Sequence, residues 1–465
     1  MSLKNFAKKL FPKKLLNLRH LFWAWYGAVK YGHPSEELLV IGITGTSGKS
    51  STAYFLRQIL EFAGFKVGSL STIDFYVAGE EKLNDQKMTM LGKMKIQKYL
   101  REMVDKKCDV AIVETTSEGR MQYRHKFINY DMMILTNLYP EHIESHGSFE
   151  AYKRAKLDIF EYVSKLQRKN IQDSRLNIGR LEDWKIGEIP KIAIVNGNSE
   201  YAEEFLKYNF DKKIIFCRKD VESRVTNHEL RVFADNISSS TDGLHFNIES
   251  TVFHAPLYGE HNVMNITSAI AVAKALEIDV NVIQKAVSEL KSPPGRIEFI
   301  SEAEQFGFKV IVDYAFEPGA LKALYDVVDL LKPQSRIIHV CGSTGGGRDK
   351  ARRVPIGEFV GKKADVFFVT DEDPYDEDPM EIIKTVSQGA QNVGKKLGEN
   401  LFEILDRKDA IEKAIQTAQP GDLVLITGKG SEQGMCVAGG KMIAWDDREI
   451  VRNSLKSLKS KVHKV

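Results

Sequence analysis

Short apolar runs alternate with stretches of helical periodicity along most of this 465-residue chain. Alternating strands and helices are typical of a mostly parallel sheet with helices on both faces, so we expect an α/β fold. Residues 231–256 instead alternate in the manner of antiparallel strands. The runs that predict buried strands are 38–43, 65–70, 110–113, 132–137, 192–198, 214–216, 310–314, 337–341, 366–370 and 423–427.

The turn-forming run Ser292-Pro293-Pro294-Gly295 separates two such alternating regions and predicts a domain boundary. We therefore expect three parts. Residues 1–37 form a short basic and aromatic helical segment. Residues 38–293 form a central domain with a P-loop-type parallel sheet, and residues 294–465 form a smaller, Rossmann-like C-terminal domain.

A glycine-rich loop, Gly45-Thr46-Ser47-Gly48-Lys49-Ser50-Ser51, lies between the first strand and a helical pattern. This order predicts a phosphate-binding loop, because loop N–H groups and the positive end of a helix attract phosphate oxygens. Lys49 would reach the β- and γ-phosphates of a nucleotide, and the Ser50 hydroxyl would contact Mg²⁺. The spacing departs from the strict pattern, which requires glycine where this chain has Ile43. The alternative interpretation is a glycine-rich turn without chemical function.

Polar residues follow two other strands of the central region. Glu114 ends one strand and His142 follows the next, so both should lie near the phosphate loop as metal ligands. Taken alone, His142 would be a structural or surface histidine. Lys156 lies on the apolar face of the predicted helix 149–163. From the residues alone we favour a lysine that extends to solvent over a buried, neutral and reactive amine.

Bulk composition excludes several classes of protein. The net charge of +3 does not indicate a nucleic-acid binder, and the four distant cysteines indicate a reduced, cytoplasmic protein. No apolar run reaches the length of a membrane span. The basic N-terminus precedes the aromatic run Leu21–Tyr26. This pattern is compatible with a helix on a membrane surface, but we favour a helix whose aromatic face packs on the protein.

Nine motifs in order resemble the Mur ligase family of ATP-dependent amide-forming ligases, and most closely its MurE branch, the UDP-N-acetylmuramoyl-tripeptide synthetases. The resemblance runs from about Val40 to about Leu455. The motifs are the phosphate loop, Glu114–Gly119 with Gln122 and Arg124, Thr136–His142 with His146-Gly147, Ala155-Lys156, Gly259 with Asn262 and Asn265, Gly295-Arg296, Asp313–Ala315, Gly346–Lys350 and Gly428–Gly430.

The resemblance implies roles for particular residues. ATP phosphates would bind the loop and Lys49, one Mg²⁺ would bind Ser50 and Glu114, and a second metal would bind Glu114, His142 and a carbamylated Lys156. Further nucleotide contacts are implied for Asn262, Asn265, Arg296 and Asp313. Contacts with the UDP-sugar substrate or the acceptor amino acid are implied for Thr116, Ser117, Gln122, Arg124, Arg348, Asp373, Tyr375 and Glu432. The implied reaction forms an acyl phosphate, which an amine then attacks.

The chain departs from the family pattern in three places. Only 37 residues precede the first strand, where MurE proteins usually carry a separate uridine-nucleotide domain. Phe316 replaces a usual histidine. Diaminopimelate-specific members carry Asp-Asn-Pro-Arg where this chain has Glu372-Asp373-Pro374-Tyr375. Because acids remain and the arginine is lost, we expect a cationic acceptor such as L-lysine.

Two other functions remain open on the sequence. The first is a Mur-type ligase acting on another carboxylate, as in polyglutamylation or cyanophycin-like synthesis. The second is a nucleotide-binding scaffold without catalysis, which the intact Lys49, Glu114, His142 and Lys156 oppose. A P-loop kinase or GTPase is excluded, since no guanine-reading motif or kinase lid is present. We expect a monomeric enzyme that uses ATP and Mg²⁺.

Overall fold

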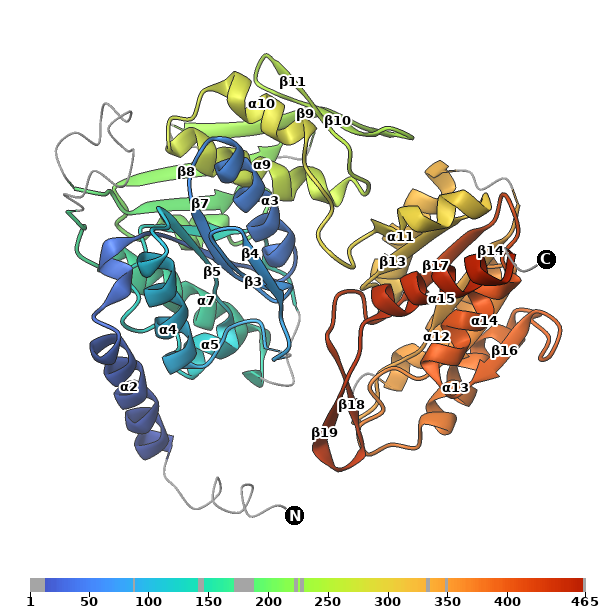
Figure 1. Ribbon diagram of the computed structural model, residues 1–465. Helices are drawn as coiled ribbons and strands as arrows, with labels where there is room; N and C mark the ends of the chain where they lie inside the picture. Colours follow the sequence, from blue (N-terminus) through green and yellow to red (C-terminus); the bar gives the residue numbers. More distant parts are fainter. Residues whose placement is uncertain are drawn as a thin grey trace. The chain divides into compact units, whose positions relative to one another are not determined.

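The computed structural model describes residues 13–86, 88–140, 146–170, 188–220, 225, 230–331, 335–347 and 350–462. Its internal contacts divide the chain into two compact units, and each has its own sheet with helices packed on it (Figure 1). Unit 1 comprises residues 1–82 and 88–291, and unit 2 comprises residues 83–87 and 292–465. The predicted α/β class is confirmed, with a large, mostly parallel sheet in unit 1 and a smaller sheet in unit 2.

The sheet of unit 1 has the strand order β11-β10-β9-β8-β7-β6-β1-β5-β2-β3-β4. The strands from β9 through β2 in this order are parallel, and antiparallel strands extend the sheet at both ends. The strands are β1 (Leu39–Thr44), β2 (Val67–Leu70), β3 (Asp74–Val77), β4 (Glu80–Leu83), β5 (Val110–Glu114), β6 (Met132–Leu135), β7 (Ile192–Asn196), β8 (Lys212–Arg218), β9 (Leu230–Ser240), β10 (Gly243–Ile248) and β11 (Thr251–Ala255).

Alternate residues of β1 enter two hydrophobic cores, because successive side chains of a strand point to opposite faces. Leu39, Ile41 and Ile43 pack with α3, α9 and α10, whereas Val40 packs with α4, α7 and α8, as does Leu38, which precedes the strand. The helices of this unit are α2 (Lys13–Lys30), α3 (Lys49–Phe62), α4 (Lys93–Asp105), α5 (Ser117–Met121), α7 (Phe149–Ser164), α8 (Ala202–Leu206), α9 (His261–Ala275) and α10 (Val280–Ser288), with the short 3₁₀ helix η1 (Pro34–Glu37).

The sheet of unit 2 has the order β12-β13-β17-β14-β15-β16 and is parallel except for β12. A separate hairpin is formed by β18 and β19. The strands are β12 (Glu298–Phe299), β13 (Lys309–Asp313), β14 (Ile337–Cys341), β15 (Val366–Thr370), β16 (Leu401–Ile404), β17 (Leu423–Thr427), β18 (Gly434–Val437) and β19 (Lys441–Ala444). The helices are α11 (Pro318–Leu331), α12 (Arg353–Lys363), α13 (Pro379–Asn392), α14 (Arg407–Thr417) and α15 (Asp447–Val462), with 3₁₀ helices η4 (Ser301–Phe306), η5 (Lys350–Arg352) and η6 (Ala438–Gly440).

Helix α2 corrects one prediction from the sequence. Its small residues Ala24 and Ala28 are the buried ones, and a side chain at Gly27 would meet Met94 and Gln97 of α4. The aromatic side chains from Phe22 to Tyr26 are instead 39–51% exposed. The expectation that the aromatic face packs on the protein is therefore wrong. Among the described residues, no helix combines the length and the apolar character needed to cross a bilayer.

Candidate nucleotide and acceptor sites

Two glycines of the phosphate loop, Gly45 and Gly48, occupy positions where a side chain would not fit. Gly45 has φ 151° and Gly48 has φ 77°, both in the region that favours glycine. A Cβ atom at Gly45 would collide with the Thr136 hydroxyl, and one at Gly48 would collide with the Asn265 amide oxygen. The loop is thus packed closely between the ends of β1 and β6 on one side and α9 on the other.

Asn137, which follows β6, fixes the backbone of this loop. Its Oδ1 accepts hydrogen bonds from the N–H groups of Thr46, at 3.1 Å, and Ser47, at 2.9 Å. The neighbouring Thr136 hydroxyl donates to the Ser47 carbonyl at 2.7 Å. The sequence analysis assigned no role to Asn137, although it lies within one of the quoted motifs. The structure shows that its amide oxygen holds the backbone of Thr46 and Ser47.

Two lysine ammonium groups converge on one carbonyl of the loop. Lys49 Nζ donates to the Gly45 carbonyl at 3.1 Å and to the Thr46 carbonyl at 2.8 Å. Lys156 Nζ, from α7, donates to the same Gly45 carbonyl at 2.7 Å and lies 4.6 Å from the centre of the Tyr152 ring. Lys156 is only 1% exposed. The interpretation of Lys156 as a lysine that extends to solvent is therefore wrong.

A cluster of oxygen atoms lies beside the first turn of α3. The Ser50 hydroxyl contacts both oxygens of the Glu114 carboxylate, at 3.2 and 3.0 Å. The N–H and hydroxyl of Thr72 donate to the same carboxylate at 2.8 and 3.0 Å, so Thr72 orients Glu114. Glu114 is the last residue of β5 and lies opposite Ile43 of β1. Such hard oxygen donors are the ligands that Mg²⁺ prefers.

Asn262 and Asn265 lie in the first two turns of α9, next to the phosphate loop. The Asn265 amide donates to Asn262 Oδ1 at 3.0 Å, and the Asn262 amide donates to the Tyr258 carbonyl at 2.8 Å. Both side chains are almost buried. The structure therefore brings these two predicted residues to the loop that holds Lys49 and Ser50. Ser51 lies in the same first turn of α3.

The residues predicted to contact the sugar nucleotide lie in and after α5. The Thr116 hydroxyl caps this helix by accepting from the Gly119 N–H, and Ser117 is its first residue. Gln122 Oε1 accepts from the Arg124 guanidinium at 2.8 Å, and the Met90 carbonyl also accepts from Arg124. Burial lowers the pKa of Arg124. The Arg124 Nε atom is buried without a hydrogen-bond partner among the described residues.

In unit 2, Asp313 supports the local backbone, and Arg296 lies against an aromatic ring. The Asp313 carboxylate accepts from the N–H groups of Ile297 and Ala315, each at 2.7 Å. The Arg296 guanidinium lies 4.1 Å from the centre of the Tyr314 ring. His142 and Arg348, also predicted as site residues, lie outside the described residues.

A buried lysine that the sequence analysis did not assign joins the two predicted acceptor acids. Lys429 Nζ lies 3.0 Å from both oxygens of Asp373, pairs with Glu432 and donates to the Gly434 carbonyl at 2.8 Å. Lys429 is fully buried. Lys429 therefore compensates the charges of Asp373 and Glu432. The expectation of a cationic acceptor cannot rest on these two acids, because neither of them is unpaired.

The loop after β15 nevertheless contains two further acids, Asp371 and Glu372. Glu372 is 3% exposed, and burial raises its pKa to about 7. Its Oε1 accepts from the Thr344 hydroxyl at 3.0 Å, but its Oε2 has no hydrogen-bond partner among the described residues. Burial also raises the pKa of Asp371 to about 6. Asp373 and Tyr375 have positive φ values of 47° and 54°, and such strained backbone is concentrated at functional sites.

Comparison with known proteins agrees with this arrangement. A family model described as "Mur ligase middle domain" matches residues 43–273, and one described as "Mur ligase, glutamate ligase domain" matches residues 295–430. A UDP-N-acetylmuramyl-tripeptide synthetase of Roseiflexus sp. (strain RS-1) is 32% identical over 437 residues, 93% of this chain and 81% of the relative. A UDP-N-acetylmuramoyl-L-alanyl-D-glutamate–2,6-diaminopimelate ligase of Clostridium botulinum is 30% identical over 432 residues, 92% and 80% of the two chains.

Solved structures share the fold. A UDP-N-acetylmuramoyl-L-alanyl-D-glutamate–2,6-diaminopimelate ligase matches with a TM-score of 0.56 and 24% identity, covering 91% of this chain and 79% of the other. The folylpolyglutamate synthase of Mycobacterium tuberculosis, solved with ADP and AMPPCP, matches with a TM-score of 0.62 and 17% identity, covering 88% and 92%.

Proposed function

Because this chain belongs to the Mur ligase family of ATP-dependent acid–amino-acid ligases, we propose that it adds a basic diamino acid, such as L-lysine, to a UDP-N-acetylmuramoyl dipeptide. The relatives named as tripeptide synthetases support the dipeptide as the carboxylate substrate. The observation that carries the choice of amino acid is the buried Glu372, whose Oε2 lacks a partner among the described residues. A substrate ammonium group would supply that partner.

The phosphate loop would bind ATP. The first N–H groups of α3 have no acceptor within the helix, so they suit phosphate oxygens, and Lys49 is held at the same loop. Ser50 and Glu114 would hold Mg²⁺, and the two hydrogen bonds from Thr72 orient the carboxylate for this purpose. When bound, Mg²⁺ offsets the negative charge of the phosphates during transfer.

The reaction consists of two displacements. The substrate carboxylate attacks the γ-phosphorus, so that a new O–P bond forms as the bond to ADP breaks. The acceptor amine then attacks the carbonyl carbon of the acyl phosphate, inorganic phosphate leaves, and the nitrogen loses a proton as the amide forms. Lys49 would stabilise the phosphate charge in the first step, and Glu372 would position the distal ammonium group of the acceptor in the second.

We extend the proposal to carbamylation of Lys156. A neutral Lys156 amine would attack CO₂, forming an N–C bond and releasing one proton, which leaves an anionic carbamate. The remaining N–H could still donate to the Gly45 carbonyl, 2.7 Å away. Because Lys156 Nζ is buried beside the Gly45 carbonyl, the carbamate would add an anionic oxygen ligand at the phosphate loop.

The test is product formation by the full chain with ATP, Mg²⁺, UDP-N-acetylmuramoyl dipeptide and an equimolar pool of L-lysine, L-ornithine and meso-diaminopimelate, followed by mass spectrometry. We expect the lysine or ornithine product to exceed the diaminopimelate product at least tenfold. Predominance of diaminopimelate would overturn the acceptor assignment. ADP release without product from any amino acid would overturn the dipeptide as substrate.

A pair of variants tests the role of Glu372. Glu372→Gln should raise the KM for the basic amino acid about tenfold and leave the KM for ATP unchanged. Glu399→Gln removes a carboxylate that is 66% exposed in the same unit and should change neither constant. Equal behaviour of the two variants would remove Glu372 from the acceptor site.

A further inference from the structure

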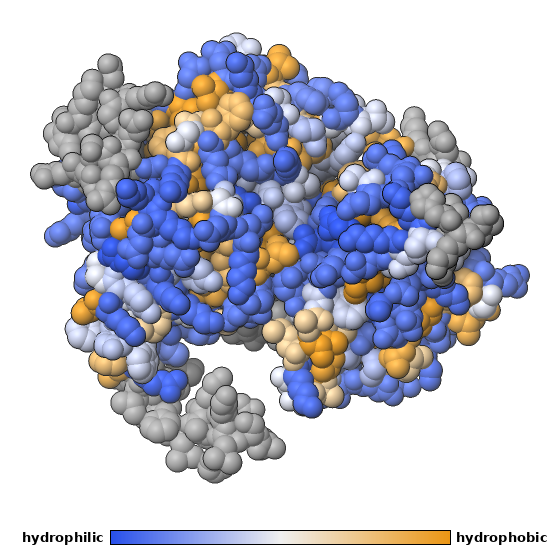
Figure 2. Space-filling view, in the orientation of Figure 1, coloured by the Kyte–Doolittle hydropathy of each residue, from blue (hydrophilic) through white to orange (hydrophobic). Residues whose placement is uncertain are grey.

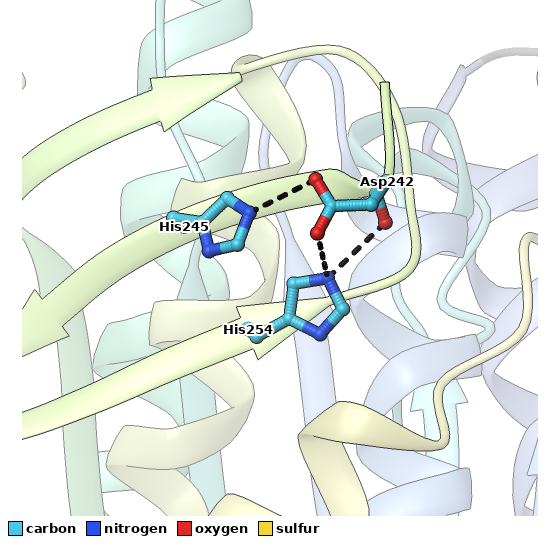
Figure 3. Close-up of side chains that lie close together, drawn as sticks. All are labelled: Asp242, His245 and His254. Carbon is cyan, nitrogen blue, oxygen red and sulfur yellow. Dashed lines mark hydrogen bonds and ion pairs between the residues drawn. The ribbon is translucent and has the colours of Figure 1, made fainter. Parts of the chain in front are cut away.

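Two histidines and an aspartate converge on the antiparallel strands that extend the sheet of unit 1 (Figure 3). His245 on β10 and His254 on β11 are direct cross-strand partners, and Asp242 lies in the turn between β9 and β10. His245 Nε2 is 3.2 Å from Asp242 Oδ1, and His254 Nε2 is 3.7 Å from Asp242 Oδ2. One ligand atom from each residue lies within 4.8 Å of the other two.

We propose that Asp242, His245 and His254 bind a divalent transition-metal ion of the Zn²⁺ class, with water in the open coordination position. Two imidazoles and one carboxylate form a common ligand set for Zn²⁺. Ligand atoms around a tetrahedral Zn²⁺ lie about 3.3 Å apart, given metal–nitrogen distances of about 2.0 Å. The three side chains are 37–66% exposed, so small rotations can bring their ligand atoms to that separation.

Hydrogen bonds hold the turn that carries the aspartate. The Ser240 hydroxyl donates to Asp242 Oδ1. The Tyr258 hydroxyl also donates to the Thr241 carbonyl at 2.7 Å, which connects this turn to the segment that leads into α9. A metal ion here would therefore brace the hairpin and the start of α9, and its role would be structural. This inference does not depend on the proposed function.

The test uses the full chain after treatment with a chelator, in the presence of excess Mg²⁺ to occupy hard-oxygen sites. Zn²⁺ is titrated by calorimetry, and thermal unfolding is recorded with and without it. We expect one equivalent to bind and to raise the midpoint temperature. His245→Gln and His254→Gln should each weaken binding at least tenfold, whereas His33→Asn, at an exposed histidine of the same unit, should not. Absence of saturable binding, or equal affinity in all variants, would overturn the assignment.

A different surface carries a second inference. Leu18, Phe22, Trp25 and Val29 recur at helical spacing along α2 and are 62, 51, 46 and 45% exposed. This exposed stripe lies opposite the buried Ala24 and Ala28. The rings of Phe22 and Tyr26 are stacked 6.1 Å apart, so the aromatic side chains contact one another. Figure 1 shows α2 extending away from the sheet of unit 1, and Figure 2 shows orange and pale residues in that region.

The N-terminal segment that contains this stripe is also rich in basic residues. Seven of the 66 Lys and Arg residues precede position 36, but none of the 63 Asp and Glu residues does. The rest of the chain therefore carries four more acidic than basic side chains, and the net positive charge belongs to the N-terminal segment. Arg19 and Lys30 lie within α2 itself.

We propose that α2 binds to the surface of an anionic membrane, with the stripe Leu18, Phe22, Trp25 and Val29 in the lipid interface and the basic residues near the headgroups. Tryptophan and tyrosine favour this interface, since their rings are apolar and their N–H or O–H groups remain hydrated. An apolar face combined with basic residues supplies the two signals that stable peripheral binding needs.

The test is co-sedimentation of the full chain with vesicles of phosphatidylcholine alone or with one quarter phosphatidylglycerol. We expect binding to the anionic vesicles, weakened by salt, and little binding to the neutral ones. Phe22→Ser with Trp25→Ser should reduce binding at least tenfold without changing the midpoint of unfolding. Met442→Ser with Ile443→Ser, on exposed residues of β19, should leave binding unchanged.

Charge variants separate the two contributions. Arg19→Glu with Lys30→Glu should weaken partitioning at least twentyfold, because each basic residue near an anionic surface contributes roughly a factor of five. Equal binding to neutral and anionic vesicles would refute the role of charge. Failure to bind either kind of vesicle would refute the membrane proposal. If the wild-type chain then sediments as an oligomer and the Phe22→Ser, Trp25→Ser variant as a monomer, the stripe binds a second copy of the chain instead.

Discussion

The buried Lys429 allows a quantitative prediction about the stability of unit 2. Lys429→Met keeps most of the aliphatic stem but removes the ammonium group that pairs with Asp373 and Glu432. Two carboxylates and the Gly434 carbonyl would then lose their shared donor. Because Asp373 is almost buried, water cannot readily replace the lost partner.

Removing one partner of a buried ion pair costs about 3–5 kcal/mol, because the remaining charge stays buried without compensation. A unit of this size shifts its midpoint by about 2–4 °C for each kcal/mol. We therefore expect Lys429→Met to lower the unfolding temperature of unit 2 by roughly 6–20 °C. Asp373→Asn in the Lys429→Met background should recover part of the loss, since it removes an uncompensated charge.

Differential scanning calorimetry gives the midpoint, and hydrogen exchange of the β15 and β17 amides identifies the unit that is destabilised. Lys408→Met is the matched control, because Lys408 is 61% exposed and its ion pair with Glu412 spans 3.7 Å. An exposed pair of this kind contributes less than about 1 kcal/mol. The reasoning is refuted if the two lysine variants behave alike, or if the effects of Lys429→Met and Asp373→Asn are additive.

Three further predictions concern the candidate sites. Lys156→Ala and Lys156→Arg should both reduce turnover at least a hundredfold in a phosphate-release assay; near-normal activity of Lys156→Arg, which remains a cation, would exclude the carbamate. Gly48→Ala should raise the KM for ATP at least tenfold, whereas Gly64→Ala, at a similarly positive φ of 92° but in open space, should affect only stability. Glu372 has a folded pKa of about 7, above its usual 4.5, so its contribution favours folding most at low pH and is lost as the pH rises through about 7. Urea unfolding at pH 5 and pH 8 should show Glu372→Gln gaining up to about 3 kcal/mol relative to wild type at the higher pH, and parallel pH profiles would contradict this.

The features predicted correctly from the sequence depend on local pattern. The order of β1, a glycine loop and α3 was readable because apolar runs, glycine positions and helical spacing are properties of neighbouring residues. The antiparallel strands β9–β11 were readable for the same reason. Strands β4 and β19 were not predicted, because their side chains are mostly exposed and carry no apolar alternation.

The features that were missed depend on contacts between distant segments. Lys429 and Asp373 are 56 residues apart, and nothing in the glycine-flanked Lys429 reveals a buried ion pair. Thr72 contacts Glu114 across 42 residues, and its role follows only from the pairing of β2 with β5. For α2, aromatic residues were expected to be buried because they are hydrophobic, but the small residues allow the closer approach to α4.

Glu114 ends β5 opposite Ile43 of β1, and this position determines which sequence changes the site of Ser50 and Glu114 tolerates. Shifting one strand by one residue would move the carboxylate by about 3.3 Å and turn it to the opposite face of the sheet. The hydrophobic cores on both faces resist such a shift. Insertions in the loops of the same unit would leave this pairing intact. Changes in the surface loops could therefore alter substrate specificity, while the pairing of the strands keeps the distance between Ser50 and Glu114 unchanged.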